Sequence, residues 1–371
     1  MKEPPLSARE FRRILLIKPS SPGDIIHALP VLHGLRRRYP AAHIAWLVAT
    51  PFANLLELDP ALSEVIHFDR SRFGRLGRSL TVTGEFLAFV RSLRLREFDL
   101  VIDLQCLFRS GFLSRACGAA TRIGFDAARE FAWLFYTHKI HVADRATSHA
   151  ADLNYRLAPL LGFQDIGMNF SITLAEEDHA HAAYLLGEAD IDAGEGYVVL
   201  VPATRWETKC WPADRFGALA EKLRLSHGLR SILVGGASDI SCGQRAADAS
   251  GGAAVNLCGR TTLRQLAAVV EHASLVVTAD STPMHMAAAL DRPLVAIFGP
   301  TNPARTGPYG RMADVVRIDL DCSPCYFKKL VQCPYQHACM DRLDVDRVSA
   351  AAAARIESGV GRPAPKKTQG A

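Results

Sequence analysis

Three loops that follow predicted strands carry the side chains whose types and spacing are best suited to chemistry. The first spans residues 18–24 and leads into a predicted helix. Its Ser20, Ser21 and Gly23 resemble a turn that cradles phosphate, although their spacing matches neither a Walker loop nor the GxGxxG motif. Asp24 falls in the first helical turn, where a carboxylate either caps backbone N–H groups or takes a proton from a substrate hydroxyl as a general base. The spacing leaves both roles open, and the two are compatible.

The second loop starts at Asp280, directly after an apolar run, and leads into another predicted helix. Pro283 suits the first helical turn, and Ser281 or Thr282 suits the cap. The N–H groups and the dipole at this end of a helix favour a phosphate or diphosphate group. Because like charges repel, Asp280 is better suited to accept hydrogen bonds from sugar hydroxyls. Capping alone, with His285 as a hydrogen-bonded helix residue, is the alternative.

The third loop, residues 203–212, follows the first predicted strand of the second half and contains Thr204 and Lys209. The Lys209 ammonium could neutralise phosphate oxygens, or it could be an ordinary surface lysine. Asp239 lies just after the next apolar run, where a carboxylate commonly holds a ribose in a Rossmann fold. Capping of the following helix is the other interpretation of Asp239.

Four cysteines lie close together near the C-terminus, in the pattern Cys322-x2-Cys325-x7-Cys333-x5-Cys339. Such a cluster could form a structural zinc or iron–sulfur site. The second pair has unusual spacing, and reduced thiols that pack a small C-terminal lobe are the alternative. No catalytic metal is expected here, because nothing places these residues at the end of a strand.

Short apolar runs alternate with helical patterns along most of the chain, which predicts parallel sheets covered on both faces. Predicted strands span residues 13–19, 43–49, 64–69, 99–105, 197–203, 231–236, 254–259, 274–280 and 294–299. Predicted helices span residues 25–38, 148–161, 213–227, 238–249, 262–272 and 283–290. The fold class is therefore α/β, with two Rossmann-like, doubly wound domains facing across a cleft. We expect domains at 1–175 and 190–345, a linker near 165–195, and a terminal helix with a disordered tail at 346–371.

The basic charge of the chain belongs to its front half. The 371 residues include 43 Lys and Arg against 38 Asp and Glu, and the net charge is +7 for residues 1–150 and −2 for residues 151–371. Such a charge attracts an anionic partner, such as nucleic acid, phospholipid or a phosphorylated substrate, unless it is simply a solvated surface. With 49% hydrophobic and 22% charged residues, the composition excludes a disordered chain or a coiled coil.

Five blocks of the chain resemble the ADP-heptose:lipopolysaccharide heptosyltransferases of glycosyltransferase family nine. The blocks are residues 18–40, 99–111, 124–136, 279–310 and the cysteine segment 322–340. The block at 124–136 is most similar to heptosyltransferase I, whereas the cysteine segment is more typical of second-heptose and related members. The resemblance covers roughly residues 12–350, with the blocks in the family's order.

The resemblance implies a GT-B fold and an inverting, metal-independent transfer of heptose from ADP-L-glycero-D-manno-heptose to the inner core of lipopolysaccharide. The acceptor would be Kdo-lipid A or a heptosylated core, and no cofactor would be required beyond the donor, ADP-heptose. Asp24 matches the family's general base, Lys209 its phosphate-binding lysine and Asp280 its heptose-binding aspartate.

The remaining site residues follow from the same resemblance. In the donor half, Ser281 and Thr282 would offer backbone N–H groups to the diphosphate, and many family members carry Gly at the position of Thr282. The other donor-site candidates are Thr204, Asp239 and His285, and the acceptor-site candidates are Ser21, Gly23, Arg109 and Arg129.

The resemblance also decides which partner suits the basic front half. An acidic glycolipid, with Kdo carboxylates and lipid phosphates, replaces nucleic acid as the expected partner. Because no secretion signal or membrane-spanning apolar run is visible, we expect a cytoplasmic protein with peripheral contact to the inner membrane. The alternatives are transfer to another acceptor, such as an outer-core sugar or a protein hydroxyl, and, further away, a nucleotide-dependent oxidoreductase or a basic nucleic-acid-binding module.

Overall fold

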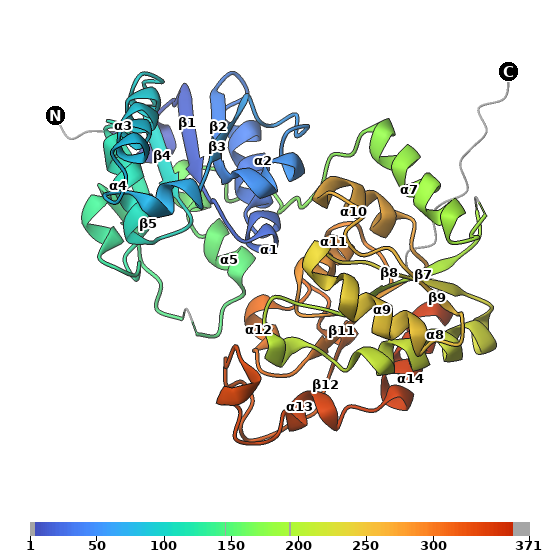
Figure 1. Cartoon of the computed structure of the whole chain (residues 1–371). Helices are drawn as coiled ribbons and strands as arrows, with labels where there is room; N and C mark the ends of the chain where they lie inside the picture. Colours follow the sequence, from blue (N-terminus) through green and yellow to red (C-terminus); the bar gives the residue numbers. More distant parts are fainter. Residues whose placement is uncertain (1–3, 145, 193, 359–371) are drawn as a thin grey trace, which may run out of the picture. The chain divides into compact units, whose positions relative to one another are not determined.

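The chain folds into two α/β units, each built on one parallel sheet (Figure 1). The computed structural model describes residues 4–144, 146–192 and 194–358. The chain divides between Thr173 and Leu174. The expected disordered tail, from Arg362 onward, lies outside the described residues. Within the described part, no helix is long and apolar enough to span a bilayer.

The first unit contains a six-stranded sheet in the order β3-β2-β1-β4-β5-β6, and all neighbouring strands are parallel. The strands are β1 Arg13–Ile17, β2 His43–Ala49, β3 Glu64–Phe68, β4 Leu100–Asp103, β5 Thr121–Phe125 and β6 His138–Ile140. The α-helices are α1 Pro22–Ile26, α2 Leu29–Arg38, α3 Leu80–Arg94, α4 Phe108–Ala116, α5 Ala150–Tyr155 and α6 Ala158–Leu161.

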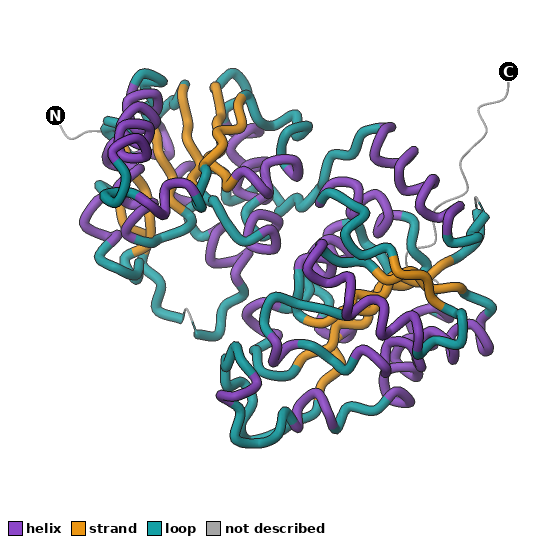
Figure 2. The backbone as a smooth tube through the Cα atoms, in the orientation of Figure 1, coloured by secondary structure: helices purple, strands orange, loops and turns teal. Residues whose placement is uncertain are grey.

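The second unit repeats this topology, with a six-stranded sheet in the order β12-β11-β10-β7-β8-β9 (Figure 2). The strands are β7 Tyr197–Val201, β8 Arg230–Leu233, β9 Ala254–Asn256, β10 Leu275–Ala279, β11 Leu294–Phe298 and β12 Val315–Arg317. The α-helices are α7 Glu176–Glu188, α8 Ala213–His227, α9 Ile240–Asp248, α10 Leu263–Glu271, α11 Thr282–Ala289, α12 Pro303–Thr306, α13 Ala338–Asp341 and α14 Val345–Glu357.

The two sheets are buried on both faces, as their continuous apolar strands require. In the first unit, Leu15 and Ile17 of β1 belong to a core cluster that includes side chains of α3 and α4. The alternate residues Ile14 and Leu16 are fully buried as well, so the opposite face is also covered. In the second unit, the corresponding cluster joins β7, β10 and β11 to α8, α9 and α14.

Both sheets have the strand order of a Rossmann fold, in which the first and fourth strands are neighbours. The connections that leave these two strands go to opposite sides, and ligands bind at the crevice between their carboxyl ends. In the first unit this point lies between β1 and β4, and in the second between β7 and β10. All three loops singled out in the sequence begin at one of these two points.

The structure confirms every predicted strand to within three residues and adds β5, β6 and β12. The single helix predicted at 25–38 is wrong, because the chain forms α1 and α2 with a break at His27 and Ala28. Pro30 lies in the first turn of α2, where its missing N–H costs nothing. The region expected to be a linker near 165–195 contains α7, which belongs to the second unit.

Gly217 of α8 tests the close packing of the second unit. An added Cβ would contact the carbonyl oxygen of Ala246 and lie 2.7 Å from Ala249, so α8 and α9 would have to separate. We expect Gly217→Ala to lower the free energy of unfolding by about 1–3 kcal/mol in urea titrations. Gly187 of α7 meets nothing within 4 Å, so Gly187→Ala is the control and should raise stability by about 0.4–1 kcal/mol. Equal effects of the two variants would contradict the packing described here.

Candidate active site

A cavity of about 360 Å³ lies at the carboxyl edge of the first sheet, beside the point where the connections from β1 and β4 diverge. Its floor is apolar and comes from the strand ends Ile17, Leu47 and Phe68. Its polar lining comes from the loops above the sheet and consists of Ser20, Arg70, Gln105, Arg109, Ser110 and Glu130. The cavity therefore combines an apolar base with two guanidinium groups, which suits a ligand that carries negative charge.

Asp24 forms a capping box at the start of α1. Its Oδ2 accepts hydrogen bonds from the backbone N–H of Ser21 at 2.8 Å and from the Ser21 hydroxyl at 2.9 Å. The capping role predicted for Asp24 is thereby confirmed. Gly23, in the same turn, is buried, and its carbonyl accepts the N–H of His27. Asp24 itself is only partly buried. The cap fixes its carboxylate at the carboxyl end of β1.

The loop after β4 is held in place by Asp103, a fully buried carboxyl group. It accepts hydrogen bonds from the N–H groups of Gln105 and Cys106 at 2.9 and 3.0 Å and from the Tyr136 hydroxyl at 2.6 Å. Burial raises the pKa of Asp103 despite these donors. The Tyr136 ring lies against Gly124, where any Cβ would overlap it. This network shapes the loop that leads to Arg109.

The two arginines predicted for the acceptor lie on adjoining loops. Arg109 starts α4 and lines the cavity, with its side chain exposed. Arg129 is exposed on the loop after β5, and its N–H donates to the carbonyl of Cys106 at 3.1 Å. The next residue, Glu130, lines the cavity and accepts the N–H of Phe108 at 3.2 Å. The structure therefore brings both arginines to the same edge of the first sheet.

In the second unit, Lys209 and Asp280 form an ion pair across the point where the connections from β7 and β10 diverge. The Lys209 Nζ lies 2.7 Å from Asp280 Oδ2, and the two side chains are 15% and 6% exposed. The same carboxylate oxygen accepts the Thr301 hydroxyl at 2.8 Å and lies 3.5 Å from the Thr306 hydroxyl. Asp280 is thus held by groups from the segments that follow β7 and β11, and it fixes the ammonium in turn.

The ammonium of Lys209 also lies over an aromatic ring. It is 4.4 Å from the centroid of Trp206, and the ammonium of Lys328 lies 5.2 Å from the same centroid. Both separations fall within the range of cation–π attraction. Two cations therefore gather at one strand end, which concentrates positive potential where an anionic group could bind.

The start of α11 presents the backbone geometry expected of an anion site. Ser281 occupies the cap position, but its side chain does not cap the helix. Its hydroxyl lies 2.8 Å from the Thr278 hydroxyl instead. The cap position predicted for Ser281 is confirmed, but its hydroxyl makes no cap, because Pro283 has no N–H and the N–H of Met284 donates to the carbonyl of Ser281 at 3.2 Å. Pro283 occupies the first helical turn as predicted, and His285 is buried further along α11.

The two remaining donor candidates make local hydrogen bonds. The Thr204 hydroxyl donates to the carbonyl of Trp206 at 2.9 Å, within the loop that carries Lys209. Asp239 accepts the N–H of Gly236 at 2.8 Å in the capping box of the 3-10 turn at 237–239. It occupies the cap position of the following helix α9, but its side chain does not cap that helix. It follows β8, the strand next to β7, one position away from the Lys209 loop.

The C-terminal segment that contains the four cysteines packs against the Lys209 loop. The Thr208 hydroxyl donates to the carbonyl of Phe327 at 2.5 Å, the carbonyl of Thr208 lies 2.8 Å from His337 Nε2, and the N–H of Leu330 donates to Glu207 at 3.2 Å. This segment therefore supports the lysine from behind.

The four cysteines of this segment gather around Cys339, whose thiol interacts with the other three. Among the described residues, three side chains that could bind a metal have their ligand atoms within 4.8 Å of one another at another place in the second unit. Cys322, Cys325, Cys333 and Cys339 are not grouped this closely. Cys339 is buried beside Gly299, and its burial, with the three other thiols, raises its pKa to about 11. The other three are only partly buried on the surrounding irregular chain. The structural metal site and the packing of a small lobe by reduced thiols both stay predictions.

Comparison with known proteins identifies the family of this chain. The model of glycosyltransferase family 9 (heptosyltransferase) matches residues 86–336. Lipopolysaccharide heptosyltransferase 1 of Pseudomonas aeruginosa is 33% identical over 333 residues, which are 89% of this chain and 90% of that protein. The chain belongs to glycosyltransferase family 9. It is a glycosyltransferase, and the expected family is confirmed.

Two further proteins are similar to this chain, one compared by its sequence and one by its solved structure. Lipopolysaccharide heptosyltransferase 1 of Escherichia coli K12 is 34% identical over 82% of this chain and 93% of its own. The solved structure of E. coli heptosyltransferase WaaC with ADP-2-deoxy-2-fluoro heptose has a TM-score of 0.71 at 27% identity, covering 91% of this chain and 98% of that one. The GT-B class expected for the two parallel-sheet units is confirmed.

Several residues at the family's strand-end loops were not identified from the sequence. Thr301 and Thr306, which hold Asp280, come from the loop and short helix after β11, where the sequence predicts no site residue. Trp206 and Lys328 lie far apart in sequence and meet only in the fold. Asp103 is the last residue of β4, and Asp280 directly follows β10; a carboxylate at the end of an apolar run is the signal that could have identified Asp103.

The coupling of Lys209 and Asp280 can be measured with a double-mutant cycle. Lys209→Met and Asp280→Asn each leave a poorly solvated partner, so each should cost about 2–3 kcal/mol of unfolding free energy. The double variant should lose at least ~1 kcal/mol less than the sum of the two. The control is the exposed pair of Glu188 and Arg260, also 2.7 Å apart, whose coupling should stay below about 0.5 kcal/mol. Similar coupling in both pairs would show that Lys209 and Asp280 do not depend on each other.

Proposed function

We propose that this enzyme transfers heptose from ADP-L-glycero-D-manno-heptose to the inner core of lipopolysaccharide, with Kdo-lipid A as the acceptor. The observation that carries the proposal is the ion pair of Lys209 and Asp280 beside the start of α11. This arrangement combines a cation, helix N–H groups and a carboxylate at the strand ends, and so suits a sugar diphosphate. Further support comes from the relatives, which are named lipopolysaccharide heptosyltransferase 1.

The chemical groups of the donor bind to different loops of the second unit, according to their charge. Lys209 and the N–H groups of Ser281 and Thr282 bind the diphosphate, because they supply positive potential. Helix α11 carries no acidic side chain that would oppose this potential. Asp280 accepts hydrogen bonds from heptose hydroxyls through the part of its carboxylate that faces away from Lys209. Asp239 binds the ribose. Thr204 and His285 complete the donor site, since they belong to the same loop and helix as the phosphate-binding groups.

The reaction is a single in-line displacement. Asp24 takes the proton from the acceptor hydroxyl, the new bond forms between that oxygen and the anomeric carbon, and the bond from this carbon to the ADP phosphate oxygen breaks. Attack from the face opposite ADP inverts the anomeric configuration. Lys209 and the start of α11 stabilise the charge that develops on the departing diphosphate, so no divalent metal is needed.

The acceptor binds in the first unit, where the cavity at the carboxyl edge of β1 and β4 provides guanidinium groups. Arg109 and Arg129 bind the Kdo carboxylates, and Ser21 and Gly23 lie next to the base. The net charge of +7 in residues 1–150 supports this division, because the acceptor is strongly anionic.

The enzyme works in the cytoplasm, in peripheral contact with the inner membrane. The support is an exposed stripe along and just beyond α3, in which Leu80, Leu87, Arg91 and Leu95 recur at helical spacing. Leucines on the exposed face of a helix, with arginines at their side, suit the interface of an anionic bilayer. The lipid portion of the acceptor would thereby lie near the first unit.

Asp24→Asn tests the base. The amide oxygen can still accept the N–H of Ser21, so α1 keeps its cap, but the side chain can no longer take a proton. We expect kcat to fall about 10²–10⁴-fold, with the affinity for ADP unchanged, in an assay that follows ADP release from ADP-heptose and Kdo-lipid A. Asp344→Asn, which alters the capping carboxylate of α14 in the same way, should leave kcat unchanged. Near-normal turnover by Asp24→Asn would remove Asp24 as the base.

Arg129→Glu and Arg109→Glu test the acceptor site. Losing a charge-assisted hydrogen bond to a carboxylate costs about 1.5–3 kcal/mol, so the KM for Kdo-lipid A should rise roughly 10- to 100-fold. The KM for ADP-heptose should not change. Arg115→Glu makes the same change in charge in α4, at another exposed position, and serves as the control. If all three variants raise the acceptor KM equally, the basic front half acts only through its overall charge.

A further inference from the structure

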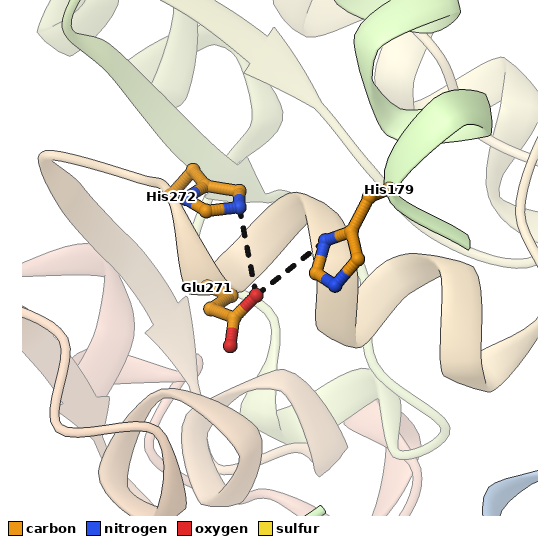
Figure 3. Close-up of side chains that lie close together, drawn as sticks. All are labelled: His179, Glu271 and His272. Atoms are coloured by element: carbon orange, nitrogen blue, oxygen red, sulfur yellow. Dashed lines mark ion pairs between the residues drawn. The ribbon is translucent and has the colours of Figure 1, made fainter. Parts of the chain in front are cut away.

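Three metal-ligating side chains meet in the second unit, away from the proposed donor site. His179 comes from α7, Glu271 is the last residue of α10, and His272 follows it (Figure 3). His272 precedes β10, so the group lies near the amino end of that strand, whereas Asp280 follows its carboxyl end. The group therefore has no part in the transfer reaction proposed above.

The spacing of the three ligand atoms matches a metal site better than a hydrogen-bond network. Oε2 of Glu271 lies 3.6 Å from Nδ1 of His179 and 3.5 Å from Nε2 of His272, and the three atoms lie within 4.8 Å of one another. These separations are too long for good hydrogen bonds. Ligands bound tetrahedrally to zinc at 2.0–2.1 Å lie about 3.3–3.4 Å from one another. Small side-chain movements would therefore close the group around one ion.

The His179 ring provides a second, independent observation. Its Nδ1 is buried and has no hydrogen-bond partner. Its charged neighbour, Oε2 of Glu271, lies 3.6 Å away, beyond good hydrogen-bond distance, so an ion bound between the two would satisfy this buried nitrogen. The side chains of His179, Glu271 and His272 are nevertheless 32%, 35% and 53% exposed, which leaves an entry path for an ion and room for water as a fourth ligand.

The two helices that carry the ligands are held together by other contacts, so the group is preorganised. Helix α7 packs along α10. Asp178, the residue before His179, forms an ion pair with Arg264 of α10 at 2.5 Å and also caps α7. On the other side, Nε2 of His181 lies 2.9 Å from the carbonyl oxygen of Arg260. His179 is therefore fixed in its approach to Glu271 whether or not an ion is bound.

We propose that His179, Glu271 and His272 bind one divalent transition-metal ion, with zinc favoured by the ligand types, and that the ion fastens α7 to α10. Two imidazole nitrogens and one carboxylate oxygen are characteristic of zinc sites, whereas magnesium and calcium prefer oxygen ligands alone. The ion has a structural role, because it joins the first helix of the second unit to the body of that unit. The proposal is independent of the sugar that the enzyme transfers.

The test is zinc titration of the full-length, untagged protein by calorimetry, together with its melting temperature. We expect one zinc ion per chain at this site and a higher Tm when it is bound, because a ligand that binds only the folded state stabilises it. His179→Ala and His272→Ala should each weaken binding roughly tenfold or more and abolish the rise in Tm. His227→Ala, at the end of α8 in the same unit, is the control and should bind zinc as the unaltered protein does.

Two further measurements keep the result unambiguous. Unchanged circular dichroism and metal-free Tm of the variants will show that loss of binding is not loss of folding. Cobalt in place of zinc should give visible bands without the intense near-ultraviolet band that thiolate ligands would add. Its spectrum therefore distinguishes this site from one formed by cysteines. Binding that survives in both histidine variants, or that disappears in Cys322→Ser/Cys325→Ser, would overturn the proposal.

Discussion

The ion pair of Lys209 and Asp280 is the interaction on which the strand-end loops of the second unit depend. Opposite charges at 2.7 Å, both largely removed from water, are stable only if the carboxylate has further donors. The hydroxyls of Thr301 and Thr306 are such donors, and they come from the loop and short helix after β11. The parallel topology places the loops after β7, β10 and β11 at one edge of the sheet, and the contacts to this one oxygen atom of Asp280 then join them.

The two units use the same strand order for different electrostatic purposes. In the first, the buried carboxyl of Asp103 is surrounded by N–H and O–H donors and shapes a loop whose exposed charges are arginines. In the second, the carboxylate of Asp280 is paired with a cation and lies beside a helix start whose cap residue bonds elsewhere. One edge thus presents charged side chains around a cavity, and the other presents a lysine and backbone dipoles. The repeated topology fixes where these loops lie, and their residues fix what they can bind.

The sequence predicts the buried strands well because parallel sheets leave a continuous apolar run, as in β2 and β7. It misses β6 and β12, which are three residues long and only partly buried, so they have no such run. It also misses α7, whose first turn is acidic and whose buried face is limited to a few positions. Lys209 and Asp280 could be selected individually by their strand-end positions. Their pairing could not, because it follows from β7 and β10 being neighbours, and the hydroxyls of Thr301 and Thr306 have no sequence signal of their own.

The contacts of Thr208 have a consequence for the order in which the enzyme becomes active during its synthesis. The loop that contains this residue is bound by Phe327 and His337, more than a hundred residues further along the chain. Trp211, two residues after Lys209, donates to the carbonyl of Leu343 in the same way. A ribosome-bound chain that ends before these residues has the strands of the second sheet but lacks the support of its lysine loop. Competence to hold a nucleotide sugar therefore arises late in translation, after almost the whole second unit has left the ribosome.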